Sequence, residues 1–204
     1  MNVVLREMLR DLESRSPGPM VVGVGGGSCS GKSTVAAWLV RHLADSKVLR
    51  MDDYYRSRPA GEGISEVNFD TPESLDLEML RLHLERLRKG ERIEKPNYDF
   101  RTHSRTGFEF FDPAGRVILD GLFALHQSIR RKVDFGVFVA CSDRERRLRR
   151  ILRDSAERGR SRMSIVHQYD TMVRPMHDLH VEDTRRAADV ILSNDEPWDG
   201  EEMT

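Results

Sequence analysis

The residues with the clearest chemical potential lie between Gly25 and Thr34, where the chain reads GGGSCSGKST. Four residues separate Gly26 from Gly31, and Lys32 and Ser33 follow directly, which is the spacing of a phosphate-binding loop. Glycine lets backbone N–H groups turn toward phosphate oxygens, and the helix that follows adds the positive end of its dipole. Lys32 is expected to hold the β- and γ-phosphates of a nucleoside triphosphate, and Ser33 to offer its hydroxyl to Mg²⁺. The residues expected to contact the nucleotide are Gly26, Gly27, Ser28, Cys29, Ser30, Gly31, Lys32, Ser33 and Thr34.

Two carboxylates follow predicted strands and form the acceptor side of the expected chemistry. Asp52 lies in MDDYYR after the second apolar run, and Asp120 lies in the DG pair after a later run. Ligands of a parallel sheet collect beyond the carboxyl ends of its strands, so both should lie near the phosphate loop. Asp52 could accept the proton of an attacking hydroxyl, with Asp53 as the next candidate. Asp120 could hold the Mg²⁺ shell, directly or through water.

The elements that must position these residues alternate between β-rich apolar runs and helical patterns. This alternation predicts an α/β fold, a parallel sheet of the P-loop NTPase type with helices on both faces. The expected strands are 20–25, 47–51, 117–119, 135–140 and 188–192, and the expected helices are 33–45, 71–89, 144–153 and 163–179. Thr71 and Pro72 resemble an N-cap and first helical residue. A polar turn between two β-prone runs predicts an inserted hairpin in residues 92–112.

The ends and composition of the chain fit one domain over residues 1–204. Apolar residues at helical spacing predict a short amphipathic helix within residues 1–19 that packs on the domain. The 33 Lys and Arg against 34 Asp and Glu argue against a general nucleic-acid binder. No apolar run approaches the ~18 residues that span a bilayer, and the charged N-terminus is unlike a signal peptide. We therefore expect a cytoplasmic protein with no membrane or nucleic-acid partner, in which neither cysteine is catalytic.

The order and content of the motifs resemble the uridine–cytidine kinases of the P-loop kinase superfamily. The likeness runs from about Val21 to Leu192. The phosphate loop is shared by many families, whereas the combination of NFD (68–70), YDF and HSR (98–105) and RD and ERGR (153–160) is far more specific. The other shared segments are MDDYYR, VILDGLFAL, HQY and AADVIL.

The resemblance implies roles on the nucleoside side of the site. Asp52 corresponds to the base that deprotonates the nucleoside 5′-hydroxyl, and Asp70 to the carboxylate that binds the ribose hydroxyls. Tyr98 and His103 correspond to the residues that read the pyrimidine edge, and histidine here accompanies acceptance of both uridine and cytidine. The side chains expected to wall the base are Tyr55, Phe69 and Phe100.

The resemblance also implies an arginine-rich lid over residues 144–162, a run that holds nine arginines. Arg153 and Arg158 are expected to face the triphosphate and to act in catalysis together with Asp52 and Lys32. Arg150, Arg160 and Gln168 are expected to contact the nucleoside, while the remaining arginines of the run are solvated or structural. A plain charged helix face, with acidic partners such as Asp154, is the alternative, and an RNA-binding patch a more remote one.

The resemblance implies ATP or GTP as donor, Mg²⁺, and a homo-oligomer, commonly a tetramer. The chain departs from the family pattern at Asp120, where glutamate is usual, which shortens the carboxylate by one methylene. The segment between Arg56 and Asn68 is short, and the chain ends soon after the last expected strand without an extended C-terminal helix. Three alternatives remain open: a kinase for ribulose phosphate, pantothenate or nicotinamide riboside, a regulatory nucleotide switch, and an inactive binding module. The Tyr98 and His103 pair weighs against the first.

Overall fold

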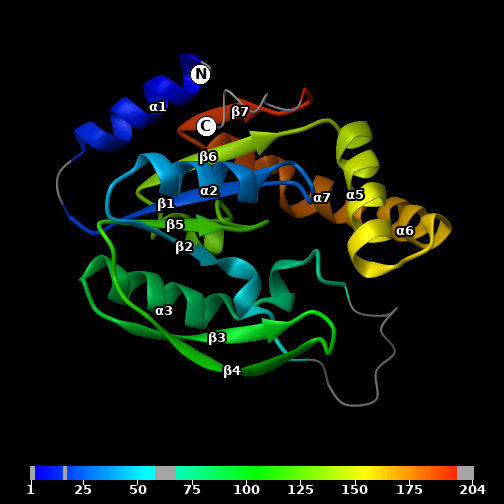
Figure 1. The fold of residues 1–204 in the computed structure, drawn as a ribbon, viewed down its shortest axis with the longest axis horizontal. Coiled ribbons are helices and arrows are strands. Elements are labelled where there is room, and N and C mark those ends of the chain that lie inside the picture. The colour runs from blue at the N-terminus through cyan, green and yellow to red at the C-terminus, as the bar shows by residue number, and fades with distance from the viewer. Residues whose placement is uncertain (1–2, 16–17, 58–67, 197–204) are drawn as a thin grey trace.

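A five-stranded parallel sheet forms the centre of the protein (Figure 1). The structure is a computed structural model, which describes residues 3–15, 18–57 and 68–196. The strands lie in the order β2 (Ser46–Arg50), β5 (Arg116–Asp120), β1 (Met20–Gly26), β6 (Phe135–Ala140) and β7 (Val190–Ser193). Each pairing between them is parallel, which confirms the predicted fold class.

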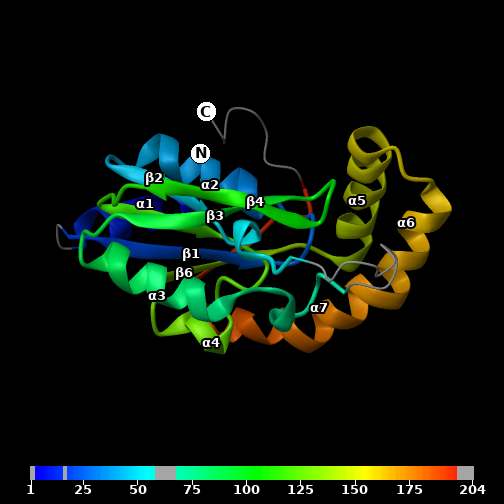
Figure 2. The same cartoon turned by 90° about the horizontal axis from the view of Figure 1, so that it is seen from below.

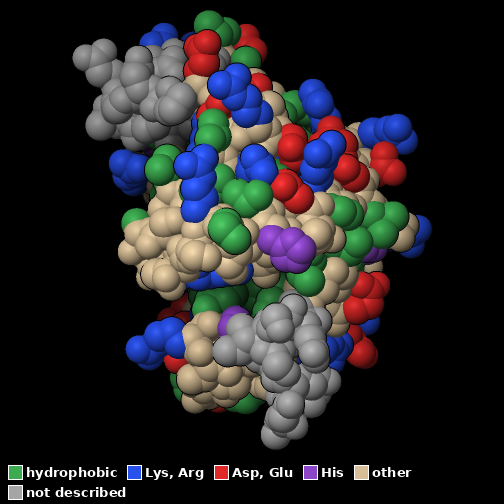
Figure 3. All heavy atoms as spheres, turned by 90° about the vertical axis from the view of Figure 1, so that its right-hand side faces the viewer, with side chains coloured by type: hydrophobic (Ala, Val, Ile, Leu, Met, Phe, Trp, Pro, Cys, Tyr) green, Lys and Arg blue, Asp and Glu red, His purple; other side chains and the backbone are tan. Residues whose placement is uncertain are grey.

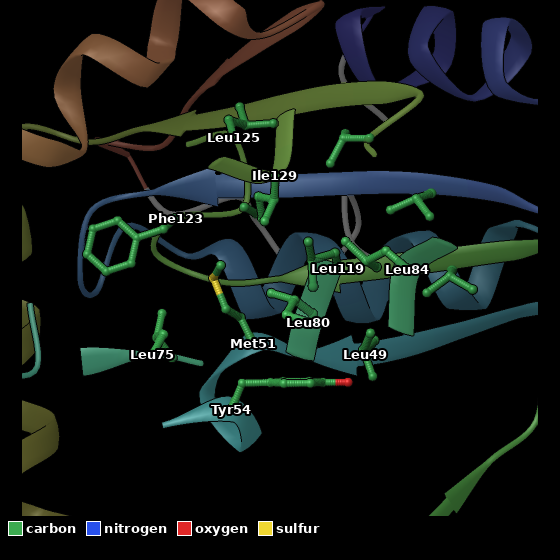
Figure 4. Packing of buried hydrophobic residues seen from close by; sticks show 14 of the residues in the cluster. Leu49, Met51, Tyr54, Leu75, Leu80, Leu84, Leu119, Phe123, Leu125 and Ile129 are labelled. Atoms are coloured by element: carbon green, nitrogen blue, oxygen red, sulfur yellow. The ribbon is translucent and has the colours of Figure 1, made fainter. Parts of the chain in front are cut away.

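Helices cover both faces of this sheet. On one face, α1 (Val3–Ser14) and α2 (Lys32–His42) pack over β1 and β6 and bury Leu12 and Trp38 completely. On the other face lie α3 (Leu77–Arg88) and the short α4 (Gln127–Arg130). Leu80, Leu84 and Leu87 recur at helical spacing along α3 and are fully buried (Figure 4). Burying each such side chain contributes about 1.5–3 kcal/mol.

The predicted hairpin is present as a separate two-stranded antiparallel sheet. It consists of β3 (Ile93–Asp99) and β4 (Ser104–Phe111), inserted in the chain between α3 and β5. β3 packs against α3 and against the 3₁₀ turn Met51–Tyr54 that follows β2. Met51 and Tyr54 anchor this turn in the core beside Leu80 (Figure 4). The hairpin is thereby held next to the segment that carries Asp52.

The helix expected from Thr71 begins later than its sequence pattern indicates. Residues Pro72–Ser74 form a 3₁₀ turn, and α3 begins at Leu77 with Asp76 as its N-cap, whose side chain accepts a hydrogen bond from the Met79 N–H. The prediction of Thr71 as N-cap of this helix is wrong because the chain first pairs with another segment. Leu75 forms a β-bridge with Tyr55. An extended residue cannot also belong to a helix.

A helical arm follows β6; its first helices lie beyond the sheet at one end of the molecule, and its last segment returns to pack against β1 and β6 (Figures 1 and 2). It is made of α5 (Asp143–Arg158), α6 (Arg162–Gln168), a π-helical turn (Tyr169–Val173), α7 (Arg174–His180) and a 3₁₀ segment (Glu182–Ala187). Gly159 ends α5 in the left-handed conformation. The segment predicted as a lid is thus the body of α5, its terminal turn and the start of α6.

Two predicted features fall outside the described residues. They are most of the segment between Arg56 and Asn68 and the part of the chain beyond Glu196. Among the described helices, none is long and apolar enough to cross a membrane.

Candidate active site

The carboxyl ends of three neighbouring strands bring the predicted site residues to one edge of the sheet. Asp120 at the end of β5 is in register with Val24 of β1 and Arg50 of β2. The phosphate loop, which follows β1, therefore lies on one side of Asp120, and the turn Met51–Tyr54, which follows β2, lies on the other side. A Cβ atom at Gly121 would lie 2.3 Å from the Met51 Cβ, so the DG pair permits this close approach. Figure 3 shows the molecule from the side on which α5 and α6 lie, where Lys and Arg side chains are interspersed with Asp and Glu side chains.

The phosphate loop has the geometry that its sequence predicts. Gly31 caps α2 with a left-handed φ of 99°, and a Cβ there would lie 2.2 Å from the Asn194 Nδ2, so glycine is required. Asn194 Nδ2 donates to the Ser30 carbonyl at 2.7 Å and ties the loop to the end of β7. Lys32 Nζ donates to the Gly27 carbonyl at 2.9 Å, so its ammonium lies over the loop. A cation and the start of a helix thus meet at one point, which is suited to phosphate.

The structure distinguishes the two adjacent aspartates of the turn. Asp53 is paired with Lys95 of β3, whose Nζ lies 2.7 Å from Asp53 Oδ2. Asp52 is exposed to solvent, although the neighbouring protein atoms desolvate its carboxylate enough to raise its pKa to about 6. Lys32 opposes the rise and Asp120 adds to it. Asp52 is therefore the carboxylate placed among the phosphate-side charges, with a pKa suited to taking a proton near neutral pH.

Asp120 has the features of a magnesium ligand. Its Oδ1 is buried and has no hydrogen-bond partner among the described residues. Buried carboxylate oxygens are normally satisfied, so an atom of this kind fits a site that a cation completes. Within the described part of the chain, no group of three or more His, Cys, Asp or Glu side chains could hold a metal by itself. Mg²⁺ is usually bound by one or two carboxylates and the substrate phosphates, so this donor set fits it.

The predicted base-reading side chains form one aromatic group from three segments. Tyr55 contacts Phe69, Tyr98 and Phe100, with ring centroids 5.4, 5.5 and 5.9 Å apart. His103 stacks on Phe69 at 5.0 Å with an interplanar angle of 24°. Its φ of 51° is left-handed and turns the chain between the two strands of the hairpin. The structure therefore brings together side chains that lie up to 48 residues apart in sequence.

Asp70 directly follows Phe69 of this aromatic group, and the cations of the site act on its carboxylate. Burial raises its pKa, while the charges of Arg150, Lys32 and Arg153 lower it. The positive charges of the phosphate loop and of α5 therefore both act on its carboxylate. Tyr55 is surrounded in the same way: burial raises its pKa well above the usual value, and the charges of Asp52 and Asp70 raise it further.

The four predicted arginines of the lid share one buried carboxylate, Asp154. Arg153 Nη2 lies 2.8 Å from Asp154 Oδ1, and the other three, Arg150, Arg158 and Arg160, approach it at 3.6 to 3.8 Å. Asp154 is completely buried. The sequence interpretation of Asp154 as one partner on a solvated charged face missed this role. Its position directly after Arg153, with arginines four and six residues later, was the available signal.

Arg150 and Gln168 connect the lid to the rest of the site. Arg150 Nη1 donates to Ser28 Oγ of the phosphate loop at 2.9 Å. Gln168 Oε1 accepts from Arg160 at 2.7 Å and from Arg150 at 3.3 Å. Arg146, which the sequence left among the structural arginines, is buried and its guanidinium lies against Gly27.

Comparisons with known proteins agree with this geometry. The sequence profile of the phosphoribulokinase/uridine kinase family matches residues 21–196. This chain belongs to that family. A uridine kinase from Brevibacillus brevis is 42% identical over 180 residues, which cover 85% of this chain and 84% of the relative. A uridine kinase from Deinococcus deserti is 40% identical over 181 residues, which cover 85% and 87% of the two chains.

The fold of this family member also matches solved structures. The phosphoribulokinase from Rhodobacter spheroides superposes with a TM-score of 0.64 at 15% identity, over 87% of this chain and 70% of that chain. At such identity the likeness supports the fold alone. Family membership confirms the resemblance that the motifs predicted. The roles assigned to individual residues remain predictions that rest on the geometry described above.

Proposed function

We propose that this protein transfers the γ-phosphoryl group of ATP or GTP to the 5′-hydroxyl of uridine or cytidine. The O–P bond to the γ-phosphorus forms at the nucleoside oxygen, the β,γ-bridging bond breaks, and the products are the nucleoside monophosphate, the nucleoside diphosphate and a proton. One observation carries the proposal: the aromatic group that contains Tyr98 and His103 adjoins Asp70, Asp52 and the phosphate loop. The names of its close relatives support the same activity.

Each group of site residues has its own role in phosphoryl transfer. Asp52 accepts the proton of the 5′-hydroxyl as the oxygen attacks. Lys32 and the phosphate loop hold the β- and γ-phosphates, and Arg153 and Arg158 stabilise charge on the moving group. When bound by Ser33 and Asp120, Mg²⁺ would neutralise charge on the phosphate oxygens. Catalysis then consists mostly of positioning and charge stabilisation.

The nucleoside side of the site selects the acceptor. The carboxylate of Asp70 can accept hydrogen bonds from both vicinal hydroxyls of ribose, which favours ribonucleosides over deoxyribonucleosides. Tyr98 and His103 read the edge of the pyrimidine, while Tyr55, Phe69 and Phe100 wall its faces. We further expect a cytoplasmic protein, and the family resemblance implies a homo-oligomer.

The test is a coupled assay of ADP release with Mg-ATP. The acceptors are uridine, cytidine, deoxycytidine, nicotinamide riboside and pantothenate, with a blank that lacks any acceptor. We expect turnover with uridine and cytidine and little with the others. Turnover with a different acceptor alone would retain the phosphate loop and the lid but contradict the roles of Tyr98 and His103. ADP release in the blank alone would favour a nucleotide-hydrolysing switch.

A further inference from the structure

A buried lysine joins the hairpin to the turn that carries Asp52. Lys95 lies on β3 and is 8% exposed. Lysine is almost never this buried without a partner, and here its Nζ contacts Asp53 at 2.7 Å and Glu109 at 2.5 Å. The two partners differ in position: Glu109 belongs to the hairpin itself and is 53% exposed, whereas Asp53 belongs to the turn and is 18% exposed.

A second cation of the hairpin contacts the same turn from β4. Arg105 Nε donates to the Tyr55 carbonyl at 3.0 Å, and its Nη2 donates to the Tyr54 carbonyl at 3.2 Å. Arg105 is also the cross-strand partner of Tyr98. Both strands of the hairpin therefore contribute a cation to the turn. Tyr98 lies on β3 three residues after Lys95, and His103 lies in the turn directly before β4, two residues before Arg105.

The geometry of the turn explains what the Lys95 contact does to Asp52. The segment Met51–Tyr54 is a 3₁₀ turn, in which consecutive side chains point about 120° apart around the axis. When Asp53 is fixed against β3, the neighbouring Asp52 must point away from the hairpin. Lys32, Asp120 and Arg153 are among the charges that act on Asp52, so its carboxylate lies within reach of the phosphate side of the site.

We propose that Lys95 is a positioning residue for phosphoryl transfer, which locks the turn that carries Asp52 to the strand that carries Tyr98. The inference rests on the proposed nucleoside kinase activity. A base seated against Tyr98 fixes the nucleoside relative to β3, and Lys95 fixes Asp52 relative to the same strand. The distance between the 5′-hydroxyl and its base is thus set through one rigid strand, and Lys95 acts on kcat through Asp53 without touching the substrate.

A purely structural role would give a different result. Replacing both partners of a buried ion pair by neutral groups is often neutral for stability, whereas removing one partner destabilises the fold because the other charge is left uncompensated. Lys95→Met releases the turn at this cost, and the double variant Lys95→Met/Asp53→Asn leaves no uncompensated charge at Asp53. A misplacement of ~1 Å can reduce the rate by about 10²-fold. Glu109→Gln is the matched control because it removes the other partner of Lys95 and leaves the contact to the turn in place.

The experiment measures kcat and both KM values with Mg-ATP and uridine for Lys95→Met, Asp53→Asn, Glu109→Gln and the double variant Lys95→Met/Asp53→Asn. We expect kcat to fall by about 10- to 100-fold in the first two, with the KM for uridine within about threefold of wild type and Glu109→Gln close to wild type. The double variant should be no worse than either single variant, since both break one interaction. Thermal unfolding shows whether each variant is folded. If Lys95→Met does not fold, Asp53→Asn alone tests the proposal, because in that variant Lys95 still has Glu109 as a partner.

Three results would overturn the inference: a kcat of Lys95→Met within twofold of wild type, a rise in the KM for uridine with kcat unchanged, or an equal loss in Glu109→Gln. A wild-type protein that does not phosphorylate uridine or cytidine would instead contradict the proposed function. The same variants are then measured with the acceptor that the wild type uses, and the same kcat criteria decide the role of Lys95.

Discussion

The ionisation of Asp52 sets the pH dependence that we expect for the reaction. Asp52 must be ionised to accept a proton, and its pKa is raised to about 6, first by burial and then by the charge of Asp120. A group with this pKa is about one-tenth ionised at pH 5 and about nine-tenths ionised at pH 7. The rate should therefore fall by about tenfold from pH 7 to pH 5. A carboxyl group with the usual pKa of 3.8 would lose less than about one-tenth of the rate over the same range.

The assay is an initial-rate pH profile with both substrates below their KM values, because this condition reports the ionisation of the free enzyme. Asp70 also has a raised pKa, so its own titration must be separated from that of Asp52. The variant Asp70→Asn should keep the acid limb, whereas Asp52→Asn should lose it and turn over about 10²- to 10⁴-fold more slowly. A wild-type profile that stays flat down to pH 5 would refute the reasoning. An acid limb that survives in Asp52→Asn would assign the base to another group, with Asp53 the next candidate.

Four further changes test other parts of the molecule. Asp70→Ala should raise the KM for uridine by about 10- to 100-fold, since hydrogen bonds to a charged group are worth about 1.5–3 kcal/mol. It should also reduce the preference of the protein for uridine over 2′-deoxyuridine. An unchanged ratio of kcat/KM for the two nucleosides would exclude Asp70 as the residue that binds the ribose hydroxyls. Asp120→Asn should raise the Mg²⁺ concentration for half-maximal rate by at least about tenfold, while Asp120→Glu should not; superimposable Mg²⁺ titrations would contradict the ligand assignment. Asp154→Asn should lower kcat and raise the KM for ATP. The loss of kcat should be smaller than the ~10³-fold that loss of a catalytic arginine can cause. Steady-state kinetics equal to those of the wild type would mean that Asp154 is not needed to position the arginines. Leu84→Ala should lower the free energy of unfolding in urea by about 2–5 kcal/mol and leave both KM values unchanged; a loss below 1 kcal/mol would contradict its place in the core.

The strands of the sheet could be predicted closely because their signal is local. The run Phe135–Ala140 is apolar on both faces, as a central parallel strand must be, and the structure has a strand of these bounds. The start of α3 could not be predicted because it is decided by a distant segment. Asp76 donates its backbone N–H to the Tyr54 carbonyl, so the turn after β2 determines where the helix begins. Similarly, the expected helix 163–179 contains a π-helical turn that the spacing of its apolar residues does not reveal.

The site shows the same division between local and long-range information. The phosphate loop is a contiguous motif, so its residues could be assigned from the sequence. Lys95 could not, because a lysine in a polar hairpin gives no sign that its ammonium is buried against Asp53. The family resemblance pointed to Asp52 rather than Asp53 as the base, and the same contact supplies a physical reason for that choice. The Asp53 carboxylate is held in place by its ammonium partner Lys95, and the neighbouring Asp52 carboxylate stays available to accept a proton.

The arginines around Asp154 show why burial must be known before charge can be interpreted. Nine arginines between residues 144 and 162 look alike in sequence, and a solvated helix face would explain them. In the structure, four of them converge on one fully buried carboxylate, which cannot neutralise them all. Burial and the neighbouring charges of Arg153 and Arg150 lower the pKa of Arg158, against the opposing effect of Asp154. A cluster this positive is stabilised further by an anion, and it lies beside the phosphate loop, where Arg150 contacts Ser28. We therefore expect a bound triphosphate to complete the charge balance that Asp154 begins, so that the proposed closure of the lid and the binding of the nucleotide would favour each other.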